Sequence, residues 1–331
     1  MVTIRNPGSI EGILRFENVS KNYGLRQALQ SLSFEVAKGE VVGFLGPNGA
    51  GKTTAMRILS GYFAPSSGRV TIAGIDLFKN PQKAKRYIGY LPEVIHLYSD
   101  MRVREYLNFV ARLKGLSERR IKEHVTEKIT ICGLTNVEHR LIGRLSKGYR
   151  QRVGIAQALV GDPAILILDE PTTGLDPKQI TEIRDLIRNL GKNRAIILST
   201  HILSEVSMIC DRVVMIDQGK ILAAGTVREL QSCLKDRDAI FVTIKGLSHK
   251  EKAKKTLEGI PGGQNLRVAS EKEDEVCFIL ETDQQQDLRP EITALFAKQK
   301  IPLLEIHRAK LSLEEIFLRI LKDGWIQERK A

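Results

Sequence analysis

The residues best suited to chemistry form one glycine-rich segment, Gly46-Pro47-Asn48-Gly49-Ala50-Gly51-Lys52-Thr53, which fits the pattern G-x-x-x-x-G-K-[ST]. Its glycines let backbone N–H groups approach phosphate oxygens without an intervening Cβ atom. In such a loop Lys52 reaches the β- and γ-phosphates of a nucleotide, and the hydroxyl of Thr53 suits Mg²⁺. A chance glycine-rich turn is the alternative. The flanks argue against it, because the apolar run Val41 to Leu45 enters the loop and a helix is expected from Thr54 to Leu59.

Two acidic residues, Asp169 and Glu170, follow directly after the apolar run Ile165 to Leu168. Strands often end in an aspartate, so the pair is informative only together with a phosphate-binding loop. In that combination Asp169 is expected to hold Mg²⁺ through its water shell, and Glu170 to polarise the attacking water molecule. A helix or turn cap is the alternative role for Glu170. The pair therefore indicates hydrolysis of a nucleoside triphosphate.

Continuous apolar runs position these residues. Val41 to Leu45, Ile165 to Leu168 and Ala195 to Leu198 have the length and composition of strands buried on both faces of a parallel sheet. The helical stretch Gln179 to Leu190 separates the last two. Further elements are expected as strands at Leu14 to Val19, Leu32 to Val36, Arg69 to Ile72 and Tyr87 to Tyr90, as helix over Val103 to Leu134, and as a hairpin over Val213 to Ala223.

Length, charge and cysteine usage set the class of protein. The 331 residues predict about two domains. The net charge of +12 lies almost entirely in the first 234 residues, because the remainder holds 18 basic and 17 acidic residues. A basic surface suits nucleic acid, anionic lipid or an acidic partner, although plain solvation is the simpler explanation. No apolar run reaches the length of a membrane span, and the four cysteines show no C-x-x-C pair. A reduced, soluble, cytoplasmic protein is expected, with any membrane role exerted through a partner.

A polar stretch from Gln231 to Arg237 marks the expected boundary between a first domain, 1–234, and a C-terminal accessory α+β domain, 235–331. Between Ala239 and Arg308 the pattern predicts strand, helix, strand, strand, helix and strand, the split order of ferredoxin-like domains. A last helix is expected from Ser312 to Leu321, with a capping box at its start.

The phosphate-binding loop, followed along the chain by the Asp169-Glu170 pair, resembles the motifs of the nucleotide-binding subunit of an ABC transporter. Leu145-Ser146-Lys147-Gly148-Tyr149-Arg150-Gln151-Arg152 resembles the signature segment, usually written L-S-G-G-Q-x-Q-R. The resemblance implies that Ser146 and the Gly148 amide touch the γ-phosphate of ATP held by the opposite subunit, with Lys147 between them in the same contact. A serine and an amide at a helix N-terminus are good donors to an anion. An ordinary helix N-cap is the alternative role for Ser146.

Further positions take their roles from the same resemblance. Gly174-Leu175-Asp176-Pro177 resembles the D-loop, so Asp176 is expected to line the dimer seam. Ser199-Thr200-His201 resembles the switch, with His201 reaching the γ-phosphate and the water, whereas a lone histidine after a strand is usually structural. Tyr23 stands where the family stacks an aromatic ring on adenine, with a core tyrosine as the alternative. Thr54, next to the phosphate-binding loop, also joins the nucleotide-binding residues.

Two departures from the family pattern stand out. Glu93, in Tyr90-Leu91-Pro92-Glu93, occupies the place of a glutamine; a carboxylate there is still a ligand for Mg²⁺. Its charge near Glu170 is expected to raise the pKa of one carboxyl group in the absence of metal. In the signature, Lys147 and Tyr149 replace glycine and glutamine, which leaves the part of Tyr149 in communication across the dimer open.

Several segments narrow the resemblance to the ATPases of ABC-2-type exporters, of the gliding-motility and multidrug-like kind. These are Tyr90 to Glu93, Leu145 to Arg152, Ser199 to Val206 and, near the chain end, Leu313 to Leu318. The implied fold is an α/β cassette with a parallel-sheet core, an antiparallel N-terminal sheet and a helical subdomain at about residues 94–160, followed by the small α+β domain.

The resemblance also implies a function and partners. A homodimer would bind ATP and Mg²⁺ and close beneath a separately encoded integral membrane permease, on the inner face of the cell membrane, without direct contact to nucleic acid. The permease contact is expected at His96 to Tyr106, with a solvated loop as the alternative. The transported substrate is not encoded in these motifs.

Two other functions compete with this one. An ABC ATPase acting on ribosomes or DNA would suit the basic first domain, but this chain has one cassette and no long heptad insertion. A nucleotide-binding regulator that hydrolyses little is disfavoured by Glu170 and His201.

Overall fold

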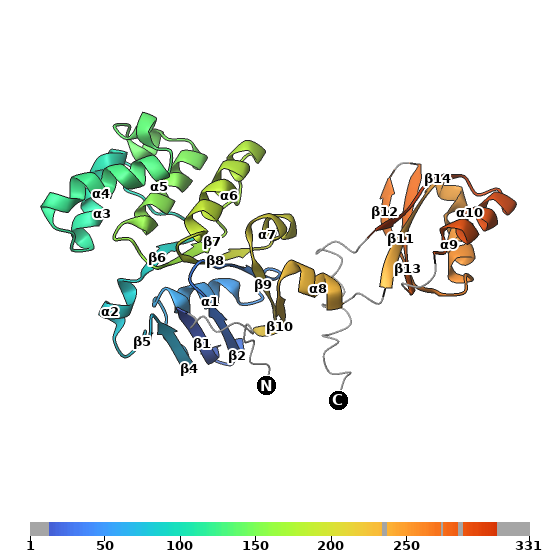
Figure 1. Cartoon of the computed structure of the whole chain (residues 1–331), viewed down its shortest axis with the longest axis horizontal. Helices are drawn as coiled ribbons and strands as arrows, with labels where there is room; N and C mark the ends of the chain where they lie inside the picture. Colours follow the sequence, from blue (N-terminus) through green and yellow to red (C-terminus); the bar gives the residue numbers. More distant parts are fainter. Residues whose placement is uncertain (1–12, 234–236, 273, 284–286, 310–331) are drawn as a thin grey trace. The chain divides into compact units, whose positions relative to one another are not determined.

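The computed structural model describes residues 13–233, 237–272, 274–283 and 287–309, which divide between Val227 and Arg228 into two compact units (Figure 1). This division falls on the N-terminal side of the boundary expected at residue 234, just inside helix α8 (Val227–Cys233). The extents 1–234, 94–160 and 235–331 stay predictions. The helix expected from Ser312 to Leu321, and the segment Leu313 to Leu318, lie outside the described residues.

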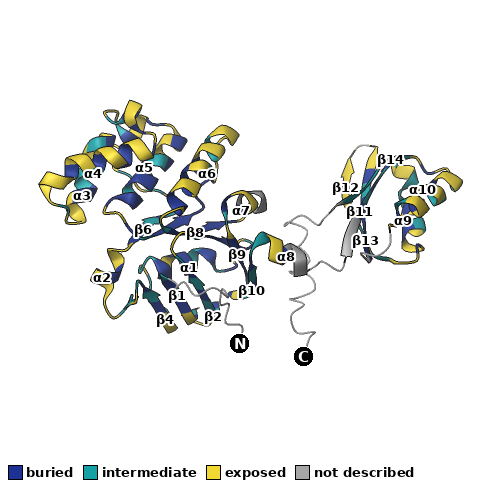
Figure 2. Cartoon of the chain, in the orientation of Figure 1, coloured by how far each residue is buried: buried dark blue, intermediate teal, exposed yellow. Residues whose placement is uncertain are grey.

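A six-stranded sheet in the order β10-β9-β3-β8-β7-β6 forms the centre of the first unit. Its parallel strands are β3 (Val41–Leu45), β6 (Ile88–Leu91), β7 (Ile165–Asp169), β8 (Ala195–Thr200) and β9 (Arg212–Asp217), and β10 (Lys220–Gly225) pairs antiparallel to β9. Every residue of β3, β7 and β8 is buried, as Figure 2 shows in dark blue, because helices cover both faces of this sheet. The predicted buried strands are confirmed.

An antiparallel sheet in the order β2-β1-β4-β5 packs beside the central sheet. Its strands are β1 (Leu14–Tyr23), β2 (Arg26–Val36), β4 (Ser67–Ile72) and the short β5 (Ile75–Asp76). The Phe34 ring of β2 contacts Phe16 of β1 at 5.0 Å between centroids and Phe44 of β3 at 5.5 Å, and the second contact joins the two sheets. Their shared core fixes the β1–β2 hairpin next to the loop that follows β3.

Helices flank the central sheet, and α1 (Lys52–Leu59) starts inside the glycine-rich segment. The helical pattern expected over Val103 to Leu134 resolves into α3 (Val103–Leu113) and α4 (Glu118–Ile131), because Gly115 at φ +79° ends the first of them. The sequence did not single out three other helices between residues 13 and 233: α2 (Pro81–Lys85), α7 (Leu203–Ile209) and α8. Helix α5 (Lys147–Leu159) follows Ser146, where a helix N-terminus was expected, but its extent was not predicted. The expected helix between the buried strands is α6 (Pro177–Gly191).

The C-terminal unit has the predicted order of elements: β11 (Arg237–Lys245), α9 (Lys250–Glu258), β12 (Gly263–Lys272), β13 (Glu275–Asp283), α10 (Arg289–Lys298) and β14 (Leu303–Ala309). The antiparallel sheet runs β12-β13-β11-β14, so the first strand lies between the third and the fourth. Leu257, Ile292 and Phe296 of the two helices pack on one face of that sheet, against residues such as Phe278. Within the described residues no helix is long and apolar enough to cross a bilayer.

Candidate functional site

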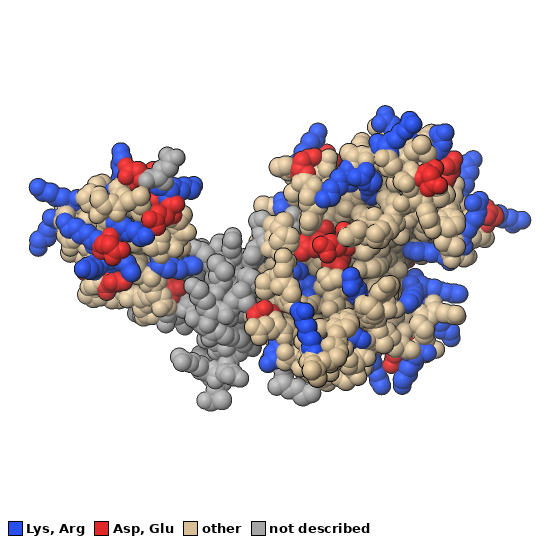
Figure 3. All heavy atoms as spheres, turned by 180° about the vertical axis from the view of Figure 1, so that it is seen from behind, with Lys and Arg blue, Asp and Glu red and all other residues tan. Residues whose placement is uncertain are grey.

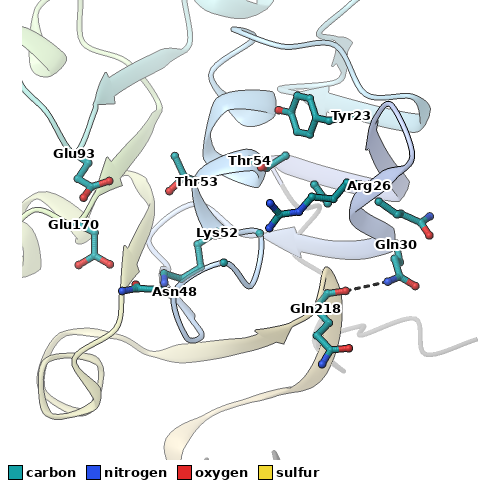
Figure 4. A pocket seen from close by; sticks show the side chains of 14 residues that line it. Tyr23, Arg26, Gln30, Asn48, Lys52, Thr53, Thr54, Glu93, Glu170 and Gln218 are labelled. Atoms are coloured by element: carbon teal, nitrogen blue, oxygen red, sulfur yellow. Dashed lines mark hydrogen bonds between the residues drawn. The ribbon is translucent and has the colours of Figure 1, made fainter.

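A cavity of about 650 Å³ opens where the β1–β2 hairpin, the glycine-rich loop and the carboxyl ends of the parallel strands meet (Figure 4). Such a position, at the ends of parallel strands, is where open α/β sheets bind ligands. The lining residues are Tyr23, Arg26, Gln27, Ala28, Gln30, Asn48, Gly49, Gly51, Lys52, Thr53, Thr54, Glu93, Glu170 and Gln218.

The glycine-rich loop is held by close backbone contacts. A Cβ atom on Gly46 would overlap the carbonyl oxygen of Ile216, and Gly51 has a left-handed φ of +107°. The ammonium group of Lys52 donates to the carbonyl oxygens of Gly46 (2.8 Å) and Pro47 (3.2 Å), both within the loop. Burial lowers the pKa of Lys52, while the nearby carboxylates of Glu170, Asp169 and Glu93 oppose that shift. The loop therefore presents a partly desolvated lysine side chain whose ammonium group is surrounded by oxygen acceptors.

Asp169 ends β7 beneath the cavity and is almost completely buried. Its Oδ1 atom accepts a hydrogen bond from the hydroxyl of Ser199 on the neighbouring strand β8, and its Oδ2 atom is buried without a hydrogen-bond partner in the described structure. Burial raises the pKa of this carboxyl group, and the charges of Glu93 and Glu170 raise it further. The expected carboxyl pKa increase therefore occurs at Asp169, and the orphan oxygen is free to accept a cation or its water.

Glu170 has a left-handed backbone, with φ +49°, which is unusual for a residue with a side chain. Its N–H donates to the carbonyl oxygen (3.2 Å) and the hydroxyl oxygen (3.1 Å) of Ser199. Its carboxylate accepts a hydrogen bond from the Thr173 hydroxyl at 3.0 Å and lies 2.9 and 3.0 Å from Nδ1 of His201. A strained backbone turn thus holds one carboxylate against a half-exposed imidazole at the edge of the cavity.

Glu93 and Glu170 face the phosphate-binding loop from one side, and Tyr23 and Arg26 face it from the other (Figure 4). Tyr23 is half exposed and makes an edge contact with Phe63, so it is not a core tyrosine. The sequence did not indicate Arg26, Gln30 or Gln218 as lining residues. Proximity to Tyr23 along the hairpin could have revealed Arg26. Gln218 comes from a distant turn, where its carbonyl oxygen accepts from Gln30 Nε2 at 3.0 Å.

Comparison with known proteins identifies the family. The family model "ABC transporter" matches residues 29–173. The bacitracin transport ATP-binding protein BcrA of Bacillus licheniformis is 35% identical over 95% of this chain and 99% of its own length. The chain belongs to the ABC transporter ATP-binding proteins.

Two further relatives agree with this assignment. The Nod factor export ATP-binding protein I of Rhizobium etli is 32% identical over 92% of both chains. A solved dimeric structure of a bacterial ABC transporter cassette superposes with a TM-score of 0.60 at 25% identity, covering 65% of this chain and 99% of that one. The predicted cassette fold is confirmed, and ATP binding and hydrolysis are this ABC protein's activity.

Ser146, Lys147, Gly148 and Asp176, which the resemblance assigns to the signature and the D-loop, do not line the cavity of their own chain. Ser146 caps α5, accepting a long hydrogen bond of 3.4 Å from the Tyr149 N–H, and Asp176 caps α6 by accepting from the Gln179 N–H at 2.9 Å. Gly148 is buried against the Gln179 side chain. The alternative expected for Ser146, a helix N-cap, is therefore present, and α5 directs its N-terminus and Ser146 to the protein surface.

Proposed function

We propose that this chain powers an ABC-2-type export transporter by hydrolysing ATP in a homodimer beneath a separate membrane permease. BcrA is a bacitracin transport protein and the Nod factor protein is an export protein, and both match this chain over nearly its full length. The observation that carries hydrolysis, beyond binding, is the Glu170 carboxylate held by His201 at the edge of the cavity that Lys52 lines.

The roles of the site residues follow from these contacts. Phosphate oxygens replace the Gly46 and Pro47 carbonyls as acceptors for Lys52, since the ammonium group already points into the loop. Glu170 takes the proton of the water that attacks the γ-phosphate, which yields ADP and inorganic phosphate. Because Nδ1 of His201 donates to that carboxylate, its Nε2 is left to contact the γ-phosphate. Tyr23 stacks on the adenine.

Mg²⁺ fits this site as a shared ion. The described residues contain no group of three His, Cys, Asp or Glu side chains that could hold a metal by themselves. Mg²⁺ commonly binds one or two protein oxygens, several waters and the substrate phosphates. Thr53, Glu93 and the orphan Oδ2 atom of Asp169 are the oxygens available here. The bound ion would neutralise charge on the β- and γ-phosphates.

A second copy of the chain completes the ATP site in this proposal. Ser146, Lys147, Gly148 and Asp176 lie away from the cavity of their own chain, yet Ser146 stands at the N-terminus of the 13-residue helix α5, which favours an anion. The dimeric cassette to which this chain is similar supports such an assembly. ATP is then bound by residues of both subunits and stabilises the dimer, and hydrolysis allows the two subunits to separate.

The permease contact is proposed at His96 to Tyr106, which follows Glu93. Within this segment the side chain of Tyr98 is 54% exposed, a large fraction for an aromatic residue. The Tyr98 ring also makes edge contacts with Tyr106 and Phe109 at 6.0 and 5.8 Å between centroids. An exposed aromatic ring that is held in place by neighbouring rings is well suited to contact a protein partner. The subunit would then sit at the inner face of the cell membrane, held there by the permease.

Glu170→Gln tests the proposed chemistry. It keeps the size of the side chain but removes the proton acceptor, so steady-state phosphate release should fall at least 100-fold while ATP-bound dimer accumulates in size-exclusion chromatography. Turnover at the parental rate would refute the role of Glu170.

The companion variant Ser146→Arg should retain ATP binding and lose dimer formation and turnover. Unchanged ATP hydrolysis in this variant would contradict an ATP site shared between two subunits. Recovery of the chain from detergent extracts with ribosomes alone, and with no membrane protein, would contradict the exporter function.

A further inference from the structure

Unpaired cations cover helix α2 and its flanks in the first unit. Lys79, Lys83, Lys85 and Arg86 are all exposed, and no Asp or Glu occurs from Leu77 to Pro92. Within the residues that the structure describes, no side-chain hydrogen bond or ion pair involves any of these four. Their charges are therefore available to an external anion.

The acidic residue that precedes this segment is already engaged. Asp76 Oδ1 accepts from the N–H groups of Phe78 (3.1 Å) and Lys79 (3.0 Å), and its Oδ2 lies 3.4 Å from Nε of Arg69. On the face shown in Figure 3, blue Lys and Arg side chains predominate along the edge of the first unit where α2 lies. The positive charge around α2 is thus not balanced by nearby acidic side chains.

Two exposed tyrosines border the same cations. Tyr62 is 72% exposed and Tyr87 is 41% exposed. The Lys85 side chain crosses Gly61, where a Cβ atom would lie 2.7 Å from Lys85 Cε, so the turn that carries Tyr62 adjoins α2. Tyr87 directly follows the helix, with its N–H bonded to the Ala84 carbonyl oxygen at 3.0 Å. Amphipathic rings beside unpaired cations are the composition of protein surfaces that lie at a membrane interface.

We infer that Lys79, Lys83, Lys85, Arg86, Tyr62 and Tyr87, here called the α2 patch, bind the anionic headgroups of a lipid bilayer directly. The patch gives the subunit its own affinity for the membrane surface, independent of the permease. It lies at the start of β6, a four-residue strand about 13 Å long that leads to Glu93 and the proposed permease contact. The inference rests on the proposed function only for the position of the subunit beneath a membrane protein.

The expected strength follows from the number of free cations. Each Lys or Arg close to an anionic leaflet strengthens binding roughly fivefold, so four of them contribute roughly several hundredfold. That affinity is weak enough to be reversible and falls with added salt, because the headgroup field decays within a Debye length of about 10 Å at 0.1 M.

Vesicle co-sedimentation of the full chain measures this affinity. The probes are vesicles of phosphatidylcholine alone and vesicles containing about 30% phosphatidylglycerol, at low and high salt. The test variant carries Gln at Lys79, Lys83, Lys85 and Arg86. The matched control carries Gln at Lys250, Lys252, Lys254 and Lys255, four lysines of α9 that share their helix with Glu251 and Glu258. Retained ATP hydrolysis in solution shows that the first unit is folded in the α2 variant, and an unchanged far-UV circular dichroism spectrum shows that the α9 control is folded.

The outcomes separate this inference from its rivals. We expect salt-sensitive binding to anionic vesicles that falls at least 50-fold in the α2 variant, changes less than threefold in the α9 control, and weakens severalfold in Tyr62→Ser. Equal loss in both quadruple variants, or no preference of the parent for anionic vesicles, would overturn it. Loss of binding to RNA or duplex DNA in the α2 variant, with vesicle binding intact, would assign the patch to nucleic acid and also overturn it. Failure of the proposed function would instead appear as unchanged turnover in Glu170→Gln, with vesicle binding unaffected.

Discussion

Removal of the Ser199 hydroxyl should destabilise the protein through a single buried carboxylate. Ser199 is fully buried on β8, and its hydroxyl donates to Oδ1 of Asp169 on β7. The other oxygen of that carboxylate has no hydrogen-bond partner in the described structure. Ser199→Ala therefore leaves both oxygens of Asp169 without a donor in the nucleotide-free protein. The Glu170 N–H loses less, because it keeps the Ser199 carbonyl oxygen as acceptor at 3.2 Å.

The size of the effect follows from the charge on the acceptor. A hydrogen bond to an ionised group contributes about 1.5–3 kcal/mol, and a buried group left unpaired costs a similar amount. We expect the free energy of unfolding to fall by about 2 kcal/mol. For a unit of this size each kcal/mol lowers Tm by about 2–4 °C, so a decrease of about 4–8 °C is expected. The variant also loosens the carboxylate beneath the proposed ATP cavity, so hydrolysis should slow.

Differential scanning calorimetry on the nucleotide-free chain measures the change, with Ser33→Ala as control. The Ser33 hydroxyl accepts from the Asn18 N–H at 2.9 Å in an exposed setting and touches no carboxylate, so its loss should cost less than about 1 kcal/mol. The decisive step is a double-mutant cycle with Asp169→Asn, in which the charge is absent. The cost of Ser199→Ala should then shrink by about 1 kcal/mol or more. If Ser199→Ala lowers the free energy of unfolding equally in the Asp169→Asn background, the loss of a hydrogen bond to the Asp169 carboxylate is not the cause of the destabilisation.

The remaining predictions concern two glycines and a cysteine. Gly46→Ala places a Cβ atom on the backbone oxygen of Ile216, which cannot move freely, so we expect a loss of more than about 3 kcal/mol in denaturant titrations. In Gly148→Ala the new Cβ atom meets the flexible end of the Gln179 side chain, so the free energy of unfolding should fall by less than about 1 kcal/mol. Equal losses in the two variants would show that the Ile216 carbonyl oxygen does not restrict position 46. Cys132 is fully buried, and burial raises the pKa of its thiol to about 12, so peptide-mapped alkylation of the native protein should leave it unmodified while Cys210 and Cys277 react. Rapid alkylation of Cys132 under native conditions would show that the packing of α4 opens readily.

Much of the fold could be predicted because its signals are local. Continuous apolar runs gave β3, β7 and β8 to within two residues, since strands covered on both faces exclude polar side chains over their whole length. The order of elements in the C-terminal unit was also predicted from local patterns, although its sheet is covered by helices on one face only. For helix α5 only the N-terminus at Ser146 was expected. Its extent was not predicted because its buried face includes Gly148, Gly154 and Gln151, so the apolar pattern of a helix is weak there.

The sequence by itself determined the proposal of a phosphate-binding loop, because the glycines, Lys52 and Thr53 form one short segment with a recognisable pattern. Only the tertiary structure decided how Asp169, Glu170 and His201, the proposed catalytic side, are held. Register between β7 and β8 sets Asp169 opposite Ser199, and the same strand end brings His201 to Glu170. The β1–β2 hairpin likewise brings Arg26 into the cavity beside Lys52. These pairings join segments far apart along the chain, and sheet register and core packing choose them; neither is written in the local pattern of residues.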